Sequence, residues 1–158
     1  MLRLLLITAL ASGAGAAALT SPVVAHALRL MPGSDLRESL TSYCEANELS
    51  AAAVLTCVGS LSAATLRLAG AEDVISLKEE LEIVSVVGTC GADSESFHLH
   101  VSLSRRDGSV LGGHIKGPMP VRTTAEIVVA ALPELSFTRE HDVATGYKEL
   151  QVRKAKQS

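Results

Sequence analysis

The spacing of apolar residues along the chain changes from strand-like to helical and back again. Residues 23–30 form a β-branched and apolar run ended by a Pro-Gly pair, which predicts a strand followed by a turn. From Leu36 to Cys44 the apolar residues recur at helical spacing behind Asp35, a typical helix-capping residue. Asn47 is a suitable helix end. The first quarter of the chain therefore predicts one strand and one principal helix.

Beyond residue 50 the pattern is that of short strands. We expect strands at 51–58, 63–68, 74–77, 81–87, 97–104, 110–116, 136–142 and 147–152, a break at Gly59-Ser60 and a loop at 88–94. Residues 127–132 form either a buried strand or a short helix, and Thr123 to Glu126 looks like a helix cap before them. Because most connections are short, we expect an α/β domain of the α+β type, with a mainly antiparallel sheet and one principal helix packed on it.

The first 21 residues differ from the rest of the chain. Arg3 precedes an apolar run at 4–11, and small residues follow it, which is the pattern of a cleavable secretory signal. We therefore expect a secreted or secretory-pathway protein, with a mitochondrial presequence or a retained helical extension as alternatives. The run is too short to predict a membrane span, and none is expected in the mature domain. The predicted organisation is a leader at 1–21, one domain at 22–152 and a basic tail at 153–158.

Composition limits the classes of function. The formal net charge is −3 and aromatic residues make up 3% of the chain, which argues against a free-standing nucleic-acid binder with a basic surface or stacking platforms. The three cysteines are an odd number without metal-knuckle spacing, so we expect buried thiols rather than a disulfide framework.

Three histidines form the clearest candidate site. His98 and His100 are two residues apart on a predicted strand and therefore share a face, while His114 is on the partner strand of a hairpin. A two- or four-residue loop would set His114 opposite Val101, on the other face. A three-residue turn closed by Gly108, or a bulge in the partner strand, would return it to the shared face.

Convergence of the three imidazoles would suit Zn²⁺ or another divalent transition metal with an open coordination position. Glu126 or Asp107 is then a candidate hydrogen-bond acceptor for a metal-bound histidine, or a candidate base. Arg122 is a candidate contact for an anionic ligand, and Gly112 and Gly113 allow close backbone approach. The alternative is that the histidines are partly buried and satisfied by their neighbours.

Motifs spread over residues 24 to 150 resemble the PPC domain family, named for its occurrence in plants and prokaryotes. They are Leu28-Arg29-Leu30-Met31-Pro32-Gly33-Ser34-Asp35-Leu36, Val58-Gly59-Ser60-Leu61-Ser62, His98-Leu99-His100, Gly112-Gly113-His114 and Thr124-Ala125-Glu126-Ile127. The resemblance implies a mainly antiparallel sheet with one helix and assembly into a homotrimer. It also implies that His98, His100 and His114 match the family histidines for which a metal has been suggested.

The resemblance leaves three functions open. The first is a homotrimeric assembly or ligand-binding module of unassigned biochemical role that holds a divalent metal. The second is a metal-dependent enzyme, a hydrolase or lyase, with a three-histidine site. The third, by family analogy alone, is a DNA-associated regulator, although the chain has no basic AT-hook and its net charge argues against nucleic acid as a partner. The small-molecule ligand is not identified by the sequence.

Overall fold

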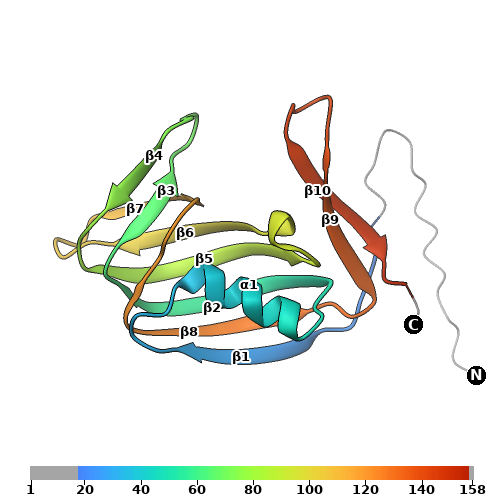
Figure 1. Ribbon diagram of the computed structural model, residues 1–158, viewed down its shortest axis with the longest axis horizontal. Coiled ribbons are helices and arrows are strands. Elements are labelled where there is room, and N and C mark those ends of the chain that lie inside the picture. Colours follow the sequence, from blue (N-terminus) through green and yellow to red (C-terminus); the bar gives the residue numbers. More distant parts are fainter. Residues whose placement is uncertain (1–17, 157–158) are drawn as a thin grey trace, which may run out of the picture.

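The computed structural model describes residues 18–156, so most of the predicted leader at 1–21 lies outside the described residues and stays a prediction. A large curved sheet carries one helix across one face, and a separate hairpin stands at one end (Figure 1). The strands are β1 (Val24–Leu30), β2 (Ala51–Leu61), β3 (Ala64–Arg67), β4 (Val74–Leu77), β5 (Leu81–Gly91), β6 (His98–Ser104), β7 (Val110–Ile115), β8 (Val121–Ala131), β9 (Leu135–His141) and β10 (Lys148–Lys154); the helices are α1 (Leu36–Ala46) and a 3-10 turn η1 (Ser94–Ser96).

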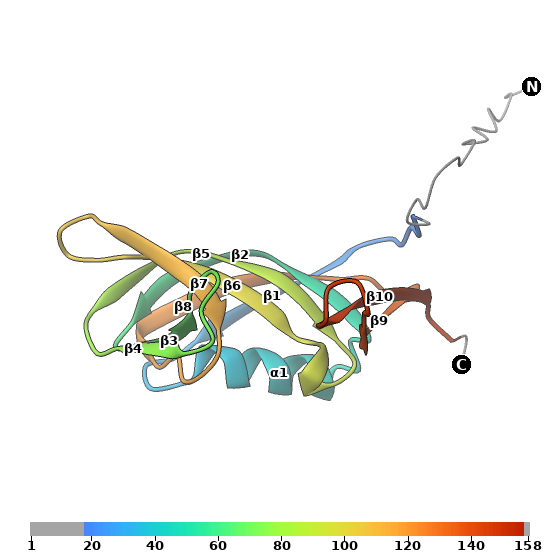
Figure 2. The ribbon, with the colours of Figure 1, turned by 90° about the horizontal axis from the view of Figure 1, so that it is seen from above.

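The main sheet has eight strands in the order β1-β8-β2-β5-β6-β7-β3-β4, and all of its named pairs are antiparallel. This confirms the expected antiparallel sheet with one principal helix. Figure 2 shows α1 lying along one side of the sheet, and within residues 18–156 no helix covers the opposite side. No helix in the described part of the chain has the length and apolar character needed to cross a membrane.

Helix α1 is capped as the sequence predicts and is tied to the sheet by the same residue. Asp35 Oδ1 accepts a hydrogen bond from the backbone N–H of Glu38 at 3.0 Å, and Asp35 Oδ2 accepts one from the N–H of Met119 at 2.5 Å. The helix buries Leu36, Leu40 and Cys44 against alternate residues of the sheet. The core is therefore a single layer of aliphatic side chains between α1 and one sheet face.

Strands β2 and β5 run further than the sequence pattern indicates. The expected break at Gly59-Ser60 lies inside β2, and the expected loop at 88–94 is strand as far as Gly91. Both predictions took glycine as the end of a strand. In the structure Gly59 (φ +141°) and Gly88 (φ +147°) lie where a Cβ would overlap a carbonyl oxygen of the adjacent strand. These glycines therefore allow close strand approach rather than ending strands.

The helix cap expected at Thr123 to Glu126 is also wrong, because these residues lie in the middle of β8. Strand β8 is hydrogen-bonded on both sides, to β1 and to β2. Tertiary pairing therefore overrides the local capping pattern, and of the two alternatives for 127–132 the strand is confirmed through Ala131.

The C-terminal residues form a two-stranded sheet of β9 and β10. Arg153 and Lys154, which were expected to begin a basic tail at 153–158, are the last residues of β10 and pair with Glu140 and Glu134 at 2.5 and 3.2 Å. Because these ion pairs are exposed to solvent, they contribute little to stability. The hairpin stands over one end of the sheet, near the ends of β5 and β6 (Figure 1).

All three cysteines are buried and free, as expected. Burial alone raises the pKa of Cys57 to about 12, so its thiol stays protonated at neutral pH. A buried neutral thiol is a poor nucleophile, and Cys57 serves as part of the apolar core.

Candidate metal centre

The β6–β7 hairpin brings the histidines together. His114 lies directly opposite His100 in the register, and the turn between the two strands has three residues. Gly108 closes it at φ +82°, and Asp107 Oδ1 accepts a hydrogen bond from the N–H of Ser109 at 2.9 Å. The three-residue alternative for the turn is therefore confirmed, and it places all three histidines on one face.

The three imidazole rings face one another at short range. Ring centroids are 5.0 Å apart for His98 and His100, 4.9 Å for His98 and His114, and 5.3 Å for His100 and His114. One nitrogen from each ring lies within 4.8 Å of the others, and the Nε2 atoms of His98 and His100 are 2.9 Å apart. Zinc binds imidazole nitrogen at about 2.0–2.1 Å, so small rotations would bring all three nitrogens to one ion.

Burial favours the neutral forms of His98 and His114. The pKa of His114 is lowered to about 4, first by burial and then by the positive charge of Lys116. Burial also lowers the pKa of His98, with Arg139 acting in the same direction. The Nδ1 atom of His114 is buried and has no hydrogen-bond partner in the part of the chain that the structure describes. A neutral imidazole with an unpartnered nitrogen is the form in which histidine binds a transition metal, so the donor set fits such an ion.

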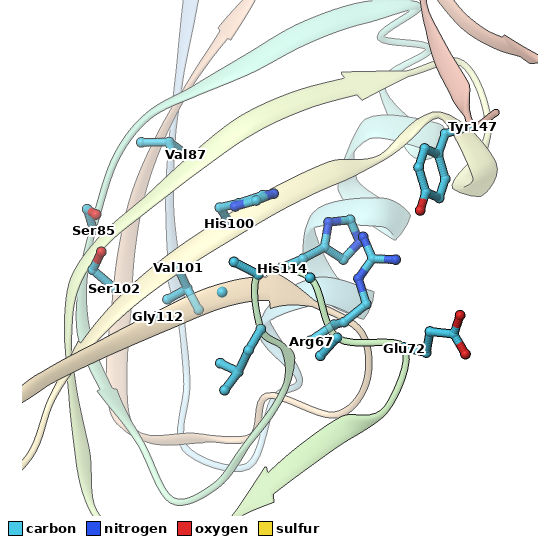
Figure 3. A pocket seen from close by; sticks show the side chains of 15 residues that line it. Arg67, Glu72, Ser85, Val87, His100, Val101, Ser102, Gly112, His114 and Tyr147 are labelled. Carbon is cyan, nitrogen blue, oxygen red and sulfur yellow. The ribbon is translucent and has the colours of Figure 1, made fainter. Parts of the chain in front are cut away.

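A pocket of about 590 Å³ opens beside His100 and His114 (Figure 3). Its wall includes Val87, Ser85 and Ser102 from β5 and β6 and the loop after β3. Gly112 and Gly113 also line it, but a Cβ at either position would overlap a backbone carbonyl oxygen of an adjacent strand. Strand packing therefore already requires glycine at these two positions.

The other residues singled out from the sequence lie elsewhere. Glu126 and Arg122 are on β8, and β2 and β5 separate that strand from β6. Arg122 Nη2 forms an exposed ion pair with Glu80 Oε1 at 2.7 Å. Asp107 is at the exposed tip of the hairpin. The structure therefore brings together the histidines and the two glycines of the predicted site, and none of these charged residues.

Sequence reasoning missed several side chains that surround the cluster. Arg67 on β3 is the register partner of His114, and Figure 3 shows its guanidinium beside the His114 ring. Tyr147, in the turn before β10, directs its hydroxyl into the same space (Figure 3). The alternation of β3 places Arg67 on the outward face, but no sequence signal links β3 or the C-terminal hairpin to the histidines.

Several curated proteins are similar to this chain over only part of their own length. The chain is 42% identical over 135 residues to the bifunctional protein GlmU of Synechococcus sp. (strain JA-3-3Ab), covering 85% of this chain and 21% of GlmU. It is 32% identical over 111 residues to AT-hook motif nuclear-localized protein 15 of Arabidopsis thaliana, covering 67% and 35% of the two chains. The chain thus spans about a fifth of the length of its GlmU relatives.

Solved structures share the fold over nearly their whole length. A hypothetical protein from Salmonella cholerae-suis matches with a TM-score of 0.82 and 38% identity, covering 86% of this chain and 97% of that one. A metal-containing protein from Archaeoglobus fulgidus matches with a TM-score of 0.75 and 27% identity, covering 85% and 99%. The model of the Plants and Prokaryotes Conserved (PCC) domain matches residues 20–133, and the chain belongs to this family.

Proposed function

We propose that this protein is a homotrimeric PCC-domain module that binds a divalent transition metal, zinc in the first place, through His98, His100 and His114. The observation that carries the proposal is the convergence of three imidazole nitrogens within 4.8 Å on one face of a rigid hairpin. Three histidines with a position left open are a common zinc ligand set. The metal would supply a Lewis-acidic centre at which a ligand could bind.

Two further observations support the metal. The buried Nδ1 of His114 has no partner among residues 18–156, and leaving such a group unsatisfied costs about 1–3 kcal/mol, which binding of a metal by this nitrogen would offset. The relative from Archaeoglobus fulgidus is described as metal-containing.

Exposed apolar side chains support the assembly. The sheet face that carries the histidines is not covered by α1, and large apolar side chains on β2 and β5 are about half exposed there. They are Leu55 (57%), Val58 (49%), Val84 (52%) and Val87 (51%). A contiguous exposed apolar patch on a small domain marks a binding surface, and copies of the same chain are the partner that the family resemblance implies.

Elemental analysis of the purified protein tests the metal site. We expect about one zinc or similar ion per chain in the wild type, as for a three-histidine site with an open position. The double variant His100→Ala, His114→Ala should lose the ion, because one remaining imidazole binds zinc weakly. His141→Ala is the matched control, since His141 is exposed at the end of β9 and is not part of the cluster. A wild type without metal after dialysis against zinc would reject the site.

A further inference from the structure

A second pocket, of about 350 Å³, is lined by His98 and His114 and is rich in positive charge. We call it the cationic pocket; its lining includes Arg67, Lys116, Arg139 and Lys148, the acids Glu95 and Glu149, and Tyr147. Four cations against two acids leave an excess of two positive charges in a chain whose net charge is −3. Positive charge is thus concentrated beside the histidines although the net charge of the whole chain is negative.

Three of the four cations have no ion-pair partner in the described part of the chain. Lys148 Nζ pairs with Glu95 Oε2 at 3.4 Å. Among residues 18–156, no ion pair within 4.0 Å involves Arg67, Lys116 or Arg139. Cations held close together without counter-charges repel one another, and an anion would relieve that repulsion.

Arg139 is held in place by two hydrogen bonds from its terminal nitrogens. Its Nη2 donates to Thr89 Oγ1 at 3.3 Å, and its Nη1 donates to the backbone carbonyl oxygen of Lys148 at 3.4 Å. Its Nε atom is buried, and none of the described residues accepts a hydrogen bond from it. An arginine fixed by its neighbours loses little conformational entropy when it binds a carboxylate or phosphate, which makes it a good anion contact.

The cationic pocket also adjoins the histidines. Arg139 and Lys116 are close enough to lower the pKa of His98, and Lys116 and Arg67 do the same at His114. Arg67 and His114 line both this pocket and the larger one, so the two spaces meet at the metal centre. Figure 3 shows the Arg67 guanidinium and the Tyr147 hydroxyl directed toward this shared space.

We propose that the cationic pocket binds a small molecule through its carboxylate or phosphate group, which Arg67, Lys116 and Arg139 hold beside the three histidines. The inference rests on the proposed function in one respect, namely that a metal on the histidines would supply the ligand's second contact. Arg139 and Tyr147 belong to the C-terminal hairpin, beyond the residues 20–133 that the family model matches. The pocket volume suits a small metabolite-sized anion rather than a nucleic acid strand.

Isothermal titration of the full protein, before and after loading with zinc, tests the inference with inorganic phosphate and with succinate as probes. Sodium chloride at the same ionic strength is the blank. We expect saturable binding of one probe, and Arg139→Gln or Arg67→Gln should weaken it about tenfold or more, as for loss of a charge-assisted hydrogen bond. The probe that binds distinguishes a phosphate from a carboxylate ligand. Arg106→Gln is the matched control, because Arg106 is exposed in the β6–β7 turn.

Zinc content measured on the same samples separates the two proposals. If zinc is bound but neither probe binds, or if the Arg139→Gln and Arg67→Gln proteins bind as well as the wild type, the anion site is rejected and the metal centre stands. If zinc is absent but a probe binds and is lost in these variants, the anion site stands and the metal centre is rejected. Circular dichroism identifies any variant that fails to fold, and Lys116→Gln then replaces it.

Discussion

The three histidines share a face but differ in exposure. His100 is exposed, while His98 and His114 are partly buried, and burial is the first cause that lowers the pKa of each of these two. Burial in the fold therefore favours the neutral imidazoles of His98 and His114, the form in which histidine binds a transition metal. This has a consequence for stability that can be measured on the metal-free protein.

We predict that the metal-free protein loses stability as the pH falls from about 6.5 to about 4. In this range the unfolded chain protonates His114, whose unfolded pKa is near 6.5, while the folded protein, with a pKa of about 4, does not. In this range the unfolded state binds more protons than the folded state. The free energy of unfolding therefore decreases as the pH decreases. Urea denaturation at several pH values measures this slope, and His114→Leu should flatten it.

The control for the pH experiment is His141→Leu, which removes an exposed histidine outside the cluster. Its slope should follow that of the wild type. An equally flat slope in both variants, or a wild-type stability that does not change between pH 7 and pH 4.5, would contradict the assignment to His114.

Gly88 on β5 packs directly against the backbone of His98, one of the three histidines of the candidate site. A Cβ at this position would overlap the carbonyl oxygen of His98, and the backbone has φ +147°. We predict that Gly88→Ala lowers the free energy of unfolding by more than about 2 kcal/mol and reduces zinc binding, because β5 must move away from His98. Urea denaturation and metal content measure both effects.

Gly108→Asn is the matched control for Gly88→Ala. Gly108 also has positive φ, +82°, but it has open space around its Cα. Asparagine tolerates this conformation, so the cost should be at most about 1 kcal/mol. If Gly88→Ala proved as mild as this control, the close approach of β5 and β6 would not be a constraint on the fold.

At the scale of elements, the sequence determined the hairpin strands but not their register. Asp107-Gly108 is compatible with loops of two, three or four residues, and only one parity places His114 with His100. The three-residue turn is identified by the positive φ of Gly108 and by the hydrogen bond from Ser109 N–H to Asp107, which only the structure provides. A loop one residue longer or shorter would place His114 on the opposite face of the sheet from His98 and His100.

Other elements were mispredicted for a common reason. Local patterns at Gly59 and at Thr123 to Glu126 indicate a break and a helix cap, yet both segments lie in strands paired on two sides. The helix and its Asp35 cap were predicted correctly, because a cap depends on neighbours only three residues away. The cations Arg67 and Arg139 could not be found by spacing, since only the folded sheet brings β3 and β9 to the histidines.

Asp35 provides a prediction for helix α1. Its two carboxylate oxygens accept hydrogen bonds from the N–H groups of Glu38 and Met119, so it caps the helix and ties it to the segment before β8. We predict that Asp35→Ala lowers the free energy of unfolding by about 1–3 kcal/mol, because both N–H groups lose their partner. Asp35→Asn, which keeps an acceptor for the cap, should cost less. Equal losses in the two variants by urea denaturation would contradict this account.

At the scale of the whole molecule, the two faces of the sheet have different roles. One face is covered by α1 and holds the apolar core, so it stabilises the chain. The other carries the histidines among exposed aliphatic residues such as Val87, which is the register partner of His100. In the proposed trimer the metal centre would therefore lie beside the interface, because Val87 of the apolar patch pairs with His100.

The proposed trimer makes the last prediction. Leu55 lies on β2 with 57% of its surface exposed, and in an assembly through this face a lysine there would bury an unpaired charge. We predict that Leu55→Lys converts the trimer into monomers, measured as mass by light scattering after size exclusion. Val143→Lys is the control, since Val143 is 92% exposed in the β9–β10 turn, and it should remain trimeric. A monomeric wild type, or a Leu55→Lys protein that is still trimeric, would exclude assembly through this face. Leu55→Lys monomers that still bind zinc would show that one chain suffices for the metal centre.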